Sequence, residues 1–147
     1  MRHVNEAGFE LIKRFEGLSL KTYYCPANIP SVGYGHALNK HEMQKFKNGI
    51  TEAQALELLQ EDIRKAELAV SLFIKAPLTD NQYSAVTSFT YNVGSAALQR
   101  STLRAVINRS EHELVPTELM RWVYAGYRKL SGLVLRRVAE GQLYVTH

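Results

Sequence analysis

A short segment near the start of the chain contains three side chains whose types and spacing could carry chemistry. Glu16 supplies a carboxyl group, Cys25 supplies the only thiol of the sequence, and Ser31 supplies a hydroxyl. Eight residues separate Glu16 from Cys25, and five separate Cys25 from Ser31. Together these groups could donate, accept or exchange protons, which is the chemistry of acid–base catalysis.

Glu16 and Cys25 each also allow an ordinary interpretation. Glu16 falls at the carboxyl end of a predicted helix, where the dipole opposes a negative charge by about 0.3–1 kcal/mol at an exposed site. A gain in stability therefore does not explain why a glutamate stands at this position. The ordinary alternative is a solvated surface side chain, which is what most single glutamates are. A lone cysteine usually packs as a small buried hydrophobic residue. Without a second cysteine, however, no internal disulfide can form and the thiol is available for chemistry.

His36 follows the run Gly33-Tyr34-Gly35, in which the glycines favour unusual backbone conformations. Its imidazole could serve as a base or a metal ligand. No other His, Cys or acidic residue lies nearby at the spacing of a metal site, so we expect no metal. We predict a structural role, in which a hydrogen bond from the ring anchors the β segment to the long helix that follows.

The elements that must position these groups can be recognised from the sequence pattern. Asn5 is suited to cap a helix with apolar residues at helical spacing, and Gly17 is suited to end it, so Glu16 lies at the helix end. Residues 18–36 carry Gly, Pro, Asn and Ser between short strand-like runs. This pattern predicts a small, partly exposed strand-and-turn region.

Two capping boxes mark the next helices. Thr51-Glu52-Ala53-Gln54 precedes apolar residues at alternating three- and four-residue steps. This predicts a long helix, which covers roughly 30 Å or more at about 1.5 Å per residue. Thr79-Asp80-Asn81-Gln82 opens a second helix, which Gly94 is suited to end.

The rest of the chain predicts a cluster of short helices. Breaks between the helical patterns fall at Ser110, Pro116 and Gly126-Tyr127. Ser131 is expected to cap the last helix, which carries Leu135, Val138 and Leu143 as apolar residues. The whole pattern predicts an α+β chain that is predominantly helical, with two subdomains and one folding unit.

Composition and charge limit the classes of function. The 147 residues are 46% hydrophobic and 22% charged, as in one ordinary soluble domain. The formal charge of +4 favours anionic partners, but the basic residues are scattered and no nucleic-acid-binding signature is present, so we expect no nucleic-acid partner. No apolar stretch approaches the roughly 20 residues that cross a bilayer, so we expect no stable membrane association.

The run from Phe15 to Cys25, followed by Gly33-Tyr34-Gly35-His36, resembles the amino-terminal signature of the phage lysozymes of glycoside hydrolase family 24. In that family the pattern reads Glu, eight residues, Asp or Cys, five residues, Thr, then Ile-Gly-x-Gly-His. The resemblance covers nearly the whole chain, because further segments match family motifs in the same order: 78–82, 89–94, 101–103, 121–122 and 132–140.

This resemblance implies a lysozyme-like fold of two lobes joined by a long helix. Residues 1–147 then form a single catalytic domain. It has a small β-containing lobe at about 15–50, a linking helix at about 51–74, and a helical lobe at about 75–147 that includes the N-terminal helix. The resemblance also implies an endolysin, a muramidase that hydrolyses the β-1,4 bond between N-acetylmuramic acid and N-acetylglucosamine in bacterial peptidoglycan. The family uses no metal and no organic cofactor.

The resemblance assigns roles to particular residues. Glu16 is the acid that protonates the leaving oxygen, and Cys25 and Ser31 take the positions that place or deprotonate water. Substrate-binding segments of the family are matched by Tyr91, Asn92 and Thr102, whose amide and hydroxyl groups could bind N-acetyl and sugar hydroxyl groups. Packing within helices is the alternative role for these three residues.

Other assignments are structural or stay open. Trp122 is expected in the core rather than as a platform for a sugar. Arg136 and Arg137 either pair with acidic residues or face the cleft, and the sequence does not decide between these arrangements.

Two positions depart from the commonest family pattern, since Cys25 replaces Asp and Ser31 replaces Thr. Cys is a known alternative in the family, and Ser retains the hydroxyl, but a neutral thiol is a weak hydrogen-bonding group. A lytic transglycosylase, which needs only the acid and forms an anhydro product, therefore stays an alternative. A peptidoglycan binder that keeps the cleft but has impaired catalysis is another.

The cellular role follows from the resemblance and from the polar start of the chain, which is unlike a secretion signal. We expect a monomer that is made in the host cytoplasm and acts on the periplasmic wall after a holin-type pore gives it access.

Overall fold

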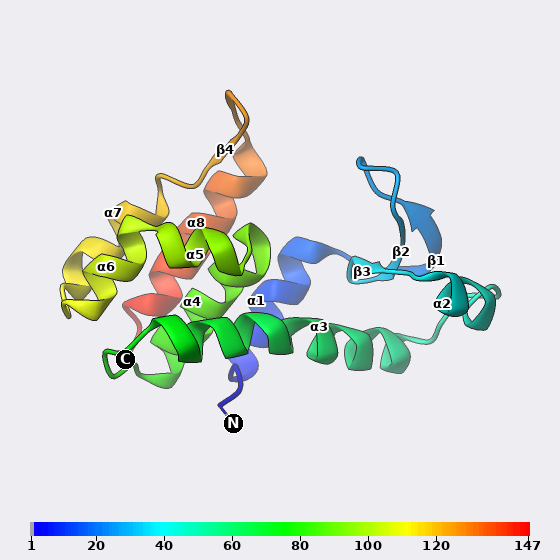
Figure 1. Cartoon of the computed structure of the whole chain (residues 1–147), viewed down its shortest axis with the longest axis horizontal. Helices are drawn as coiled ribbons and strands as arrows, with labels where there is room; N and C mark the ends of the chain where they lie inside the picture. The colour runs from blue at the N-terminus through cyan, green and yellow to red at the C-terminus, as the bar shows by residue number, and fades with distance from the viewer. Residues whose placement is uncertain (1) are drawn as a thin grey trace. The chain divides into compact units, whose positions relative to one another are not determined.

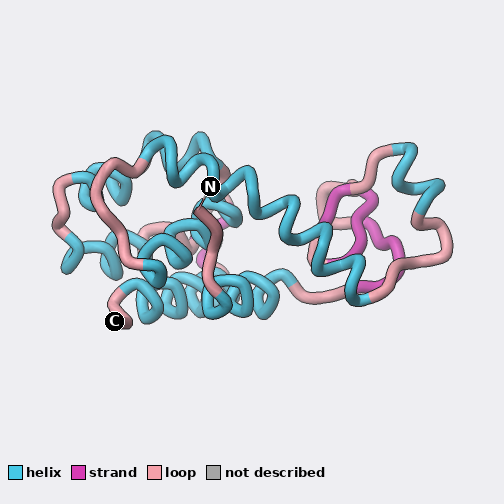
Figure 2. The backbone as a smooth tube through the Cα atoms, turned by 90° about the horizontal axis from the view of Figure 1, so that it is seen from below, coloured by secondary structure: helices cyan, strands magenta, loops and turns pink. Residues whose placement is uncertain are grey.

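The computed structural model describes residues 2–147, which divide into two compact units. The smaller unit is Glu16–Ile63, and the larger combines residues 2–15 with Arg64–His147. Helices make up most of the larger unit, and within the described residues the strands form two small antiparallel sheets (Figure 1, Figure 2). The prediction of a predominantly helical α+β fold is confirmed.

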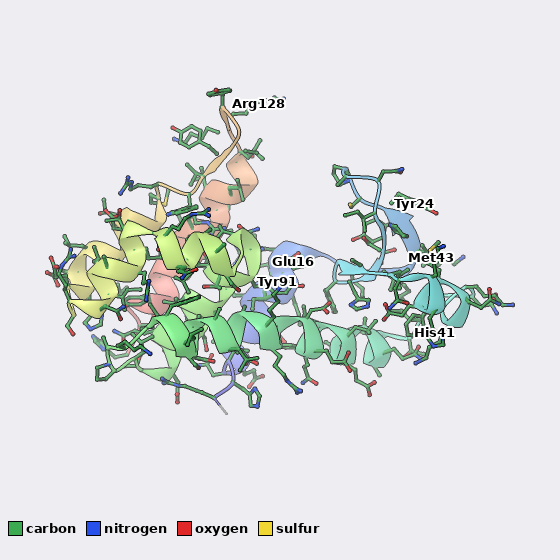
Figure 3. All side chains as sticks on the ribbon, viewed as in Figure 1. Glu16, Tyr24, His41, Met43, Tyr91 and Arg128 are labelled. Carbon is green, nitrogen blue, oxygen red and sulfur yellow. The ribbon has the colours of Figure 1, made fainter. Side chains whose placement is uncertain are left out.

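The smaller unit contains an antiparallel sheet of β1 (Ser19–Tyr24), β2 (Pro30–Gly33) and β3 (His36–Ala37), in that spatial order. The short helix α2 (Lys40–Lys45) follows. The core of this unit includes the buried side chains of Val32, Tyr34, Leu38, Phe46 and Ile50. Tyr24, on the outer strand β1, is exposed (Figure 3). The predicted strand-and-turn region is therefore present.

The long helix α3 (Glu52–Phe73) begins at the predicted capping box. The amide of Gln54 donates to Oγ1 of Thr51 at 3.1 Å, and the amide of Thr51 donates to Oε1 of Gln54 at 2.8 Å. Its apolar stripe is buried at Leu59, Ile63 and Val70. The boundary between the two units falls inside this helix, so α3 contributes to both cores.

The larger unit is built around α4 (Asp80–Val93), whose residues from Tyr83 to Thr90 are all buried. Helix α1 (Glu6–Glu16) comes so close to α4 that a Cβ on Gly8 would lie 2.5 Å from Cβ of Ser84. Helix α8 (Ser131–Tyr144) packs on both α4 and α7 (Val115–Leu119). The other helical elements after α4 are α5 (Ser95–Arg100), α6 (Thr102–Asn108) and the 3₁₀ turn η1 (His112–Leu114).

Several helix ends lie where local sequence signals predict them. The amide of Gly8 donates to Oδ1 of Asn5 at 2.9 Å, as expected for an N-cap. The second capping box is closed between Thr79 and Gln82. Gly17 and Gly94 adopt φ angles of +72° and +98°, which favour glycine and end α1 and α4.

The start of α8 and the segment before it were predicted wrongly. Residues 124–129 form a hairpin of β4 (Tyr124–Ala125) and β5 (Arg128–Lys129) rather than part of a helical cluster. Gly126 at its turn has a φ of +63°, which favours a two-residue hairpin connection. Ser131 is the first helical residue, and the N-cap position belongs to Leu130, whose side chain makes no capping hydrogen bond.

Of the apolar residues predicted for α8, only Leu143 packs against the core. Leu135 and Val138 are exposed, whereas Arg136, Arg137 and Glu140 on the same helix are buried. The buried positions hold an ion-pair cluster against α4, so the face that packs inward is charged. A hydrophobic pattern alone does not detect a helix face of this kind.

Candidate active site

Glu16 is the last residue of α1, and Gly17 turns the chain directly after it (Figure 3). Its carboxylate lies against the backbone of Gly35, because a Cβ on that glycine would be 3.5 Å from Oε1 of Glu16. Gly35 itself has a φ of +87° in the turn between β2 and β3. The carboxyl group is therefore half-buried between a helix end and a tight turn, at the end of α1 where the dipole opposes a negative charge.

Cys25 follows β1 and belongs to a tight turn. Its amide donates to the carbonyl oxygen of Ile29 at 3.0 Å, and its carbonyl oxygen accepts from the amide of Asn28 at 2.7 Å. Asn28 has a φ of +61°, an unusual value that Asn tolerates better than most residues. The free thiol is half-buried.

Tyr23 connects Glu16 and Cys25 electrostatically. Burial raises the pKa of the Tyr23 hydroxyl, and Cys25 and then Glu16 raise it further because a negative charge on either disfavours a phenolate. The carboxyl and the thiol thus both lie close enough to the same phenol to influence its ionisation. The structure places these two predicted residues in one small region.

Ser31 lies opposite Tyr23 in the β1–β2 register, but it is buried, with 4% of its surface exposed. Its hydroxyl donates to the carbonyl oxygen of Ile29 at 3.1 Å, the same carbonyl that receives the amide of Cys25. Because a hydroxyl has one proton, Ser31 can form a further hydrogen bond only as an acceptor. Backbone contacts with Ile29 thus link the two positions that the family pattern assigns to water.

His36 has the structural role predicted for it. Nδ1 contacts Oδ2 of Asp62 on α3 at 2.8 Å, and Nε2 contacts Oε2 of Glu42 on α2 at 2.8 Å. Burial lowers the pKa of His36, but the two carboxylates raise it by more, so the net shift is upward. Because the ring nitrogens point in opposite directions, the three side chains do not converge on one point. Among residues 2–147, no three His, Cys, Asp or Glu side chains are grouped as a metal site requires.

The three residues predicted to bind substrate lie in the larger unit. Tyr91 and Asn92 are neighbours near the end of α4, and Thr102 is the first residue of α6. Asn92 lines a pocket of about 310 Å³, whose other lining residues are Val93, Arg121, Trp122, Tyr124 and Leu133. Neither Tyr91 nor Thr102 lines that pocket, so Asn92 alone of the three predicted residues does.

Sequence reasoning missed part of this pocket. Trp122 packs its ring edge-on against Phe89, with centroids 5.3 Å apart, as expected of a core residue, yet it also lines the pocket. Arg121 and Tyr124 were not predicted as site residues. The Gly126-Tyr127 pair, interpreted only as a break between helical patterns, was the available signal for a hairpin turn and so for the strand that carries Tyr124.

Arg136 and Arg137 pair with an acidic residue, which the sequence left undecided. Nη1 of Arg137 donates to Oε1 of Glu140 at 2.7 Å, and Nε of Arg136 donates to Oε2 at 3.3 Å. The hydroxyl of Ser88 on α4 donates to Oε2 of Glu140 at 2.6 Å. Burial raises the pKa of Glu140, and the two guanidinium groups oppose that rise.

The chain belongs to the phage lysozyme family, which it matches over residues 13–140. It is 40% identical over 146 residues to the endolysin of Acyrthosiphon pisum secondary endosymbiont phage 1, and the match covers 97% of both chains. It is 35% identical over 147 residues to the endolysin of Bacillus phage B103, a match that covers 98% of this chain but 54% of that one. The chain thus spans about half the length of that relative.

A solved structure shows the same similarity to muramidases. The muramidase domain of SpmX from Asticaccaulis excentricus is 30% identical, with a TM-score of 0.89, and the match covers all of both chains. The resemblance drawn from the sequence motifs and the lysozyme-like fold are confirmed. Within residues 2–147, no helix has the length and apolar character needed to span a membrane.

Proposed function

We propose that this chain is an endolysin of the muramidase type. It hydrolyses the β-1,4 bond between N-acetylmuramic acid and N-acetylglucosamine in bacterial peptidoglycan, and so lyses the host cell. The observation that carries this proposal is the position of the Glu16 carboxyl, at the end of α1 beside Gly35 and Tyr23, in a member of the phage lysozyme family. Residues 1–147 act as one catalytic domain, with a small lobe at about 15–50, a linking helix at about 51–74 and a helical lobe at about 75–147.

Glu16 is the proposed general acid. Cleavage of a glycosidic bond requires that the leaving oxygen be protonated as the bond to the anomeric carbon breaks. A general acid must hold its proton until that moment. The Glu16 side chain is half-buried at the end of α1 beside the Gly35 turn, which holds the carboxyl in one place and supports this role.

Cys25 and Ser31 are the proposed water-handling residues. In an inverting reaction, water attacks the anomeric carbon from the face opposite the acid, and a second group orients that water or removes its proton. The free thiol of Cys25 can receive a proton when it is ionised, and Ser31 can accept a hydrogen bond from the water. Their shared contact with Ile29 fixes the two positions relative to each other.

Tyr91, Asn92 and Thr102 are the proposed substrate-binding residues. Their phenol, amide and hydroxyl groups match the hydrogen-bonding groups of an N-acetylated glycan. Asn92 is supported further by its place in a pocket with aromatic walls, because aromatic side chains offer flat apolar surfaces to sugar rings.

The reaction products test this proposal. Purified sacculi are digested with the protein, and the soluble fragments are analysed by mass spectrometry. New reducing ends are expected from hydrolysis. Anhydro-muramic ends instead would identify a transglycosylase, and intact sacculi would identify a binder without turnover.

We also propose the route by which the protein reaches the cell wall. The chain is made in the host cytoplasm, stays monomeric and reaches the periplasmic wall through a holin-type pore. Expression without a pore is expected to leave cells intact until the inner membrane is permeabilised, which should cause rapid loss of turbidity. Lysis before permeabilisation would contradict the need for a pore.

A further inference from the structure

Helix α8 turns its charged residues inward and its apolar residues outward. Arg136, Arg137 and Glu140 are buried, and they form the ion-pair cluster against α4. The exposed residues of the helix are all uncharged, and they are Ser131, Gly132, Leu135, Val138 and Gln142. Leu135 and Val138 are 58% and 41% exposed. A surface helix ordinarily turns its apolar residues toward the core, so the outward face of α8 has the character of a contact surface.

The β4–β5 hairpin comes directly before this helix and is exposed throughout. Residues 124–132 are all exposed, and Tyr127 lies fully exposed at the turn. Figure 3 shows Arg128 at the outer end of the hairpin, pointing away from the helices of the larger unit. Lys129 follows in β5, and Leu130 is the exposed N-cap residue of α8. The hairpin thus presents aromatic, basic and apolar side chains within four consecutive residues.

A groove joins the hairpin to the outward face of α8. Its volume is about 410 Å³, and the residues that line it are Lys129, Ser131, Val134 and Leu135. Among these lining residues Lys129 alone is charged, and Val134 and Leu135 supply the apolar walls. The groove therefore brings the basic hairpin and the apolar helix face together. We call residues 127–130, Leu135 and Val138 the α8 patch.

The charge of this region limits what can cover the α8 patch. Residues 119–139 include five basic residues and no acidic residue, and Arg121, Arg128 and Lys129 are the exposed members of the five. Two copies of the patch would bring like charges together, which disfavours a symmetric dimer through it. An anionic wall polymer would neutralise the basic groups but offers no apolar surface to α8. A phospholipid surface offers both, because its headgroups carry phosphates and its acyl chains are apolar.

We propose that the α8 patch docks on the surface of a bilayer that contains anionic phospholipids. Arg128 and Lys129 contact the headgroup phosphates, and Tyr127 lies at the level of the headgroups. Leu130, Leu135 and Val138 contact the boundary of the acyl chains. Successive side chains of a strand point to opposite faces, but a hairpin tip within the headgroup layer has lipid on both faces, so both basic side chains reach phosphates. The contact is peripheral and reversible, because it depends on a few side chains at one edge of the larger unit.

Binding to vesicles tests the proposal. The wild-type protein is sedimented with phosphatidylcholine vesicles that contain or lack phosphatidylglycerol. We expect binding that is at least roughly tenfold tighter when phosphatidylglycerol is present, and release from these vesicles as the salt concentration rises from roughly 50 mM to roughly 500 mM. Equal binding to the two kinds of vesicle, or binding to neither, would overturn the proposal.

Two double variants separate the charge of the patch from its apolar surface. Arg128→Gln/Lys129→Gln should weaken binding to the anionic vesicles by about tenfold or more, because each basic residue near an anionic surface contributes to binding. Leu135→Ser/Val138→Ser should weaken it by about tenfold, because less apolar surface is removed from water. Both pairs are exposed, so the thermal midpoints should change little. Unchanged binding of both double variants would contradict the proposed surface.

Matched controls come from exposed positions elsewhere in the larger unit. Lys75→Gln/Arg100→Gln removes the same charge, and Leu68→Ser/Leu72→Ser removes exposed apolar surface from α3. Both control variants should bind the anionic vesicles like the wild type. A loss as large as in the patch variants would show that net charge or overall hydrophobicity decides binding, and not the α8 patch.

Fluorescence places the hairpin tip directly. Tyr127→Trp puts an indole at the turn, and the wild-type protein provides the blank for Trp122. Added anionic vesicles should shift the emission of the new indole to shorter wavelength, and lipids with brominated acyl chains should quench it. Emission that stays unchanged while the protein is bound to vesicles would show that another surface makes the contact.

The other occupants of the patch predict different results. A second copy predicts a dimer in lipid-free solution that Leu135→Ser/Val138→Ser abolishes. A wall polymer predicts retention on lipid-free sacculi that Arg128→Gln/Lys129→Gln abolishes. Either result, in place of vesicle binding, would overturn the proposal. Reducing-end release from soluble glycan strands should be the same in the wild type and both patch variants, so a failure of the proposed function would leave the vesicle test intact.

Discussion

Glu16 at the end of α1 and Glu140 in the middle of α8 are glutamates in very different surroundings. Glu140 is completely buried, with both oxygens engaged by Arg136, Arg137 and Ser88. Glu16 is half-buried at a helix end where the dipole opposes its charge, beside a glycine turn. The Glu140 carboxyl is enclosed by its partners, whereas the Glu16 side chain is partly exposed to solvent. Because a general acid must reach the substrate to deliver its proton, the enclosed Glu140 does not suit that role, whereas the position of Glu16 allows it.

Glu140→Gln should show the largest effect, and the effect should be on stability. The substitution leaves the fully buried Arg137 without its carboxylate partner, and loss of one member of a buried pair typically costs about 3–5 kcal/mol. We expect a lower thermal midpoint, with most of the activity per folded molecule retained below it. An unchanged thermal midpoint would show that Glu140 does not have the structural role that distinguishes it from Glu16.

Glu16→Gln should show the opposite pattern. Gln is nearly isosteric with Glu but has no proton to transfer, so reducing-end release should fall by at least roughly 10²-fold while the thermal midpoint changes little. Circular dichroism checks the fold, and the Glu140→Gln protein at low temperature is the matched control. Undiminished release from a folded Glu16→Gln protein would show that this residue is not the acid.

Cys25 tests whether the rest of the small unit takes part in the chemistry. If the thiol handles water, Cys25→Ala should reduce hydrolysis by roughly 10- to 100-fold, whereas Cys25→Asp should retain or increase it by restoring the carboxylate usual in the family. Cys25→Ser keeps a hydrogen-bonding group and serves as the control. Reducing ends and thermal midpoints are measured for all three. Full activity in a stable Cys25→Ala protein would assign the residue to packing.

His36 should give a smaller effect that depends on pH. Its pKa lies above the ordinary 6.5, so its contribution to stability is complete below pH 6.5 and is lost as the pH rises through the higher folded value. Burial raises the pKa of Glu42, but His36 lowers it by more, so the Glu42 contribution is present above pH 4.5 and lost as the pH falls. Burial raises the pKa of Asp62, so an ionised Asp62 is less favourable in the folded protein. Its ionisation partly offsets the stability that His36 and Glu42 contribute.

The contact should therefore stabilise the protein most between about pH 4.5 and 6.5, by about 1–2 kcal/mol. His36→Gln should lower the thermal midpoint in that range and have little effect near pH 9. Unfolding followed in urea at a series of pH values measures this difference. The same loss at every pH would mean that the ring acts through packing rather than charge.

Local signals in the sequence were enough to predict much of the fold. The caps at Asn5, Thr51 and Thr79 bond to groups three residues along the chain, so their partners are visible in the sequence itself. The position of Glu16 follows in the same way from the glycine that ends α1. The predicted anchoring of His36 to the long helix is also confirmed, although its second partner, Glu42, was not anticipated.

The sequence by itself determined several helix ends, the family and the candidate acid, because these depend on neighbours along the chain or on short motifs. Only the tertiary structure decided which face of α8 is buried and that Arg137 on this face donates to Asn92 of α4. Asn92 and Arg137 are 45 residues apart, and Ser88 and Glu140 are 52 apart. Contacts at such separations depend on how α4 and α8 pack, and packing can bury a charged face whenever its partners are satisfied there.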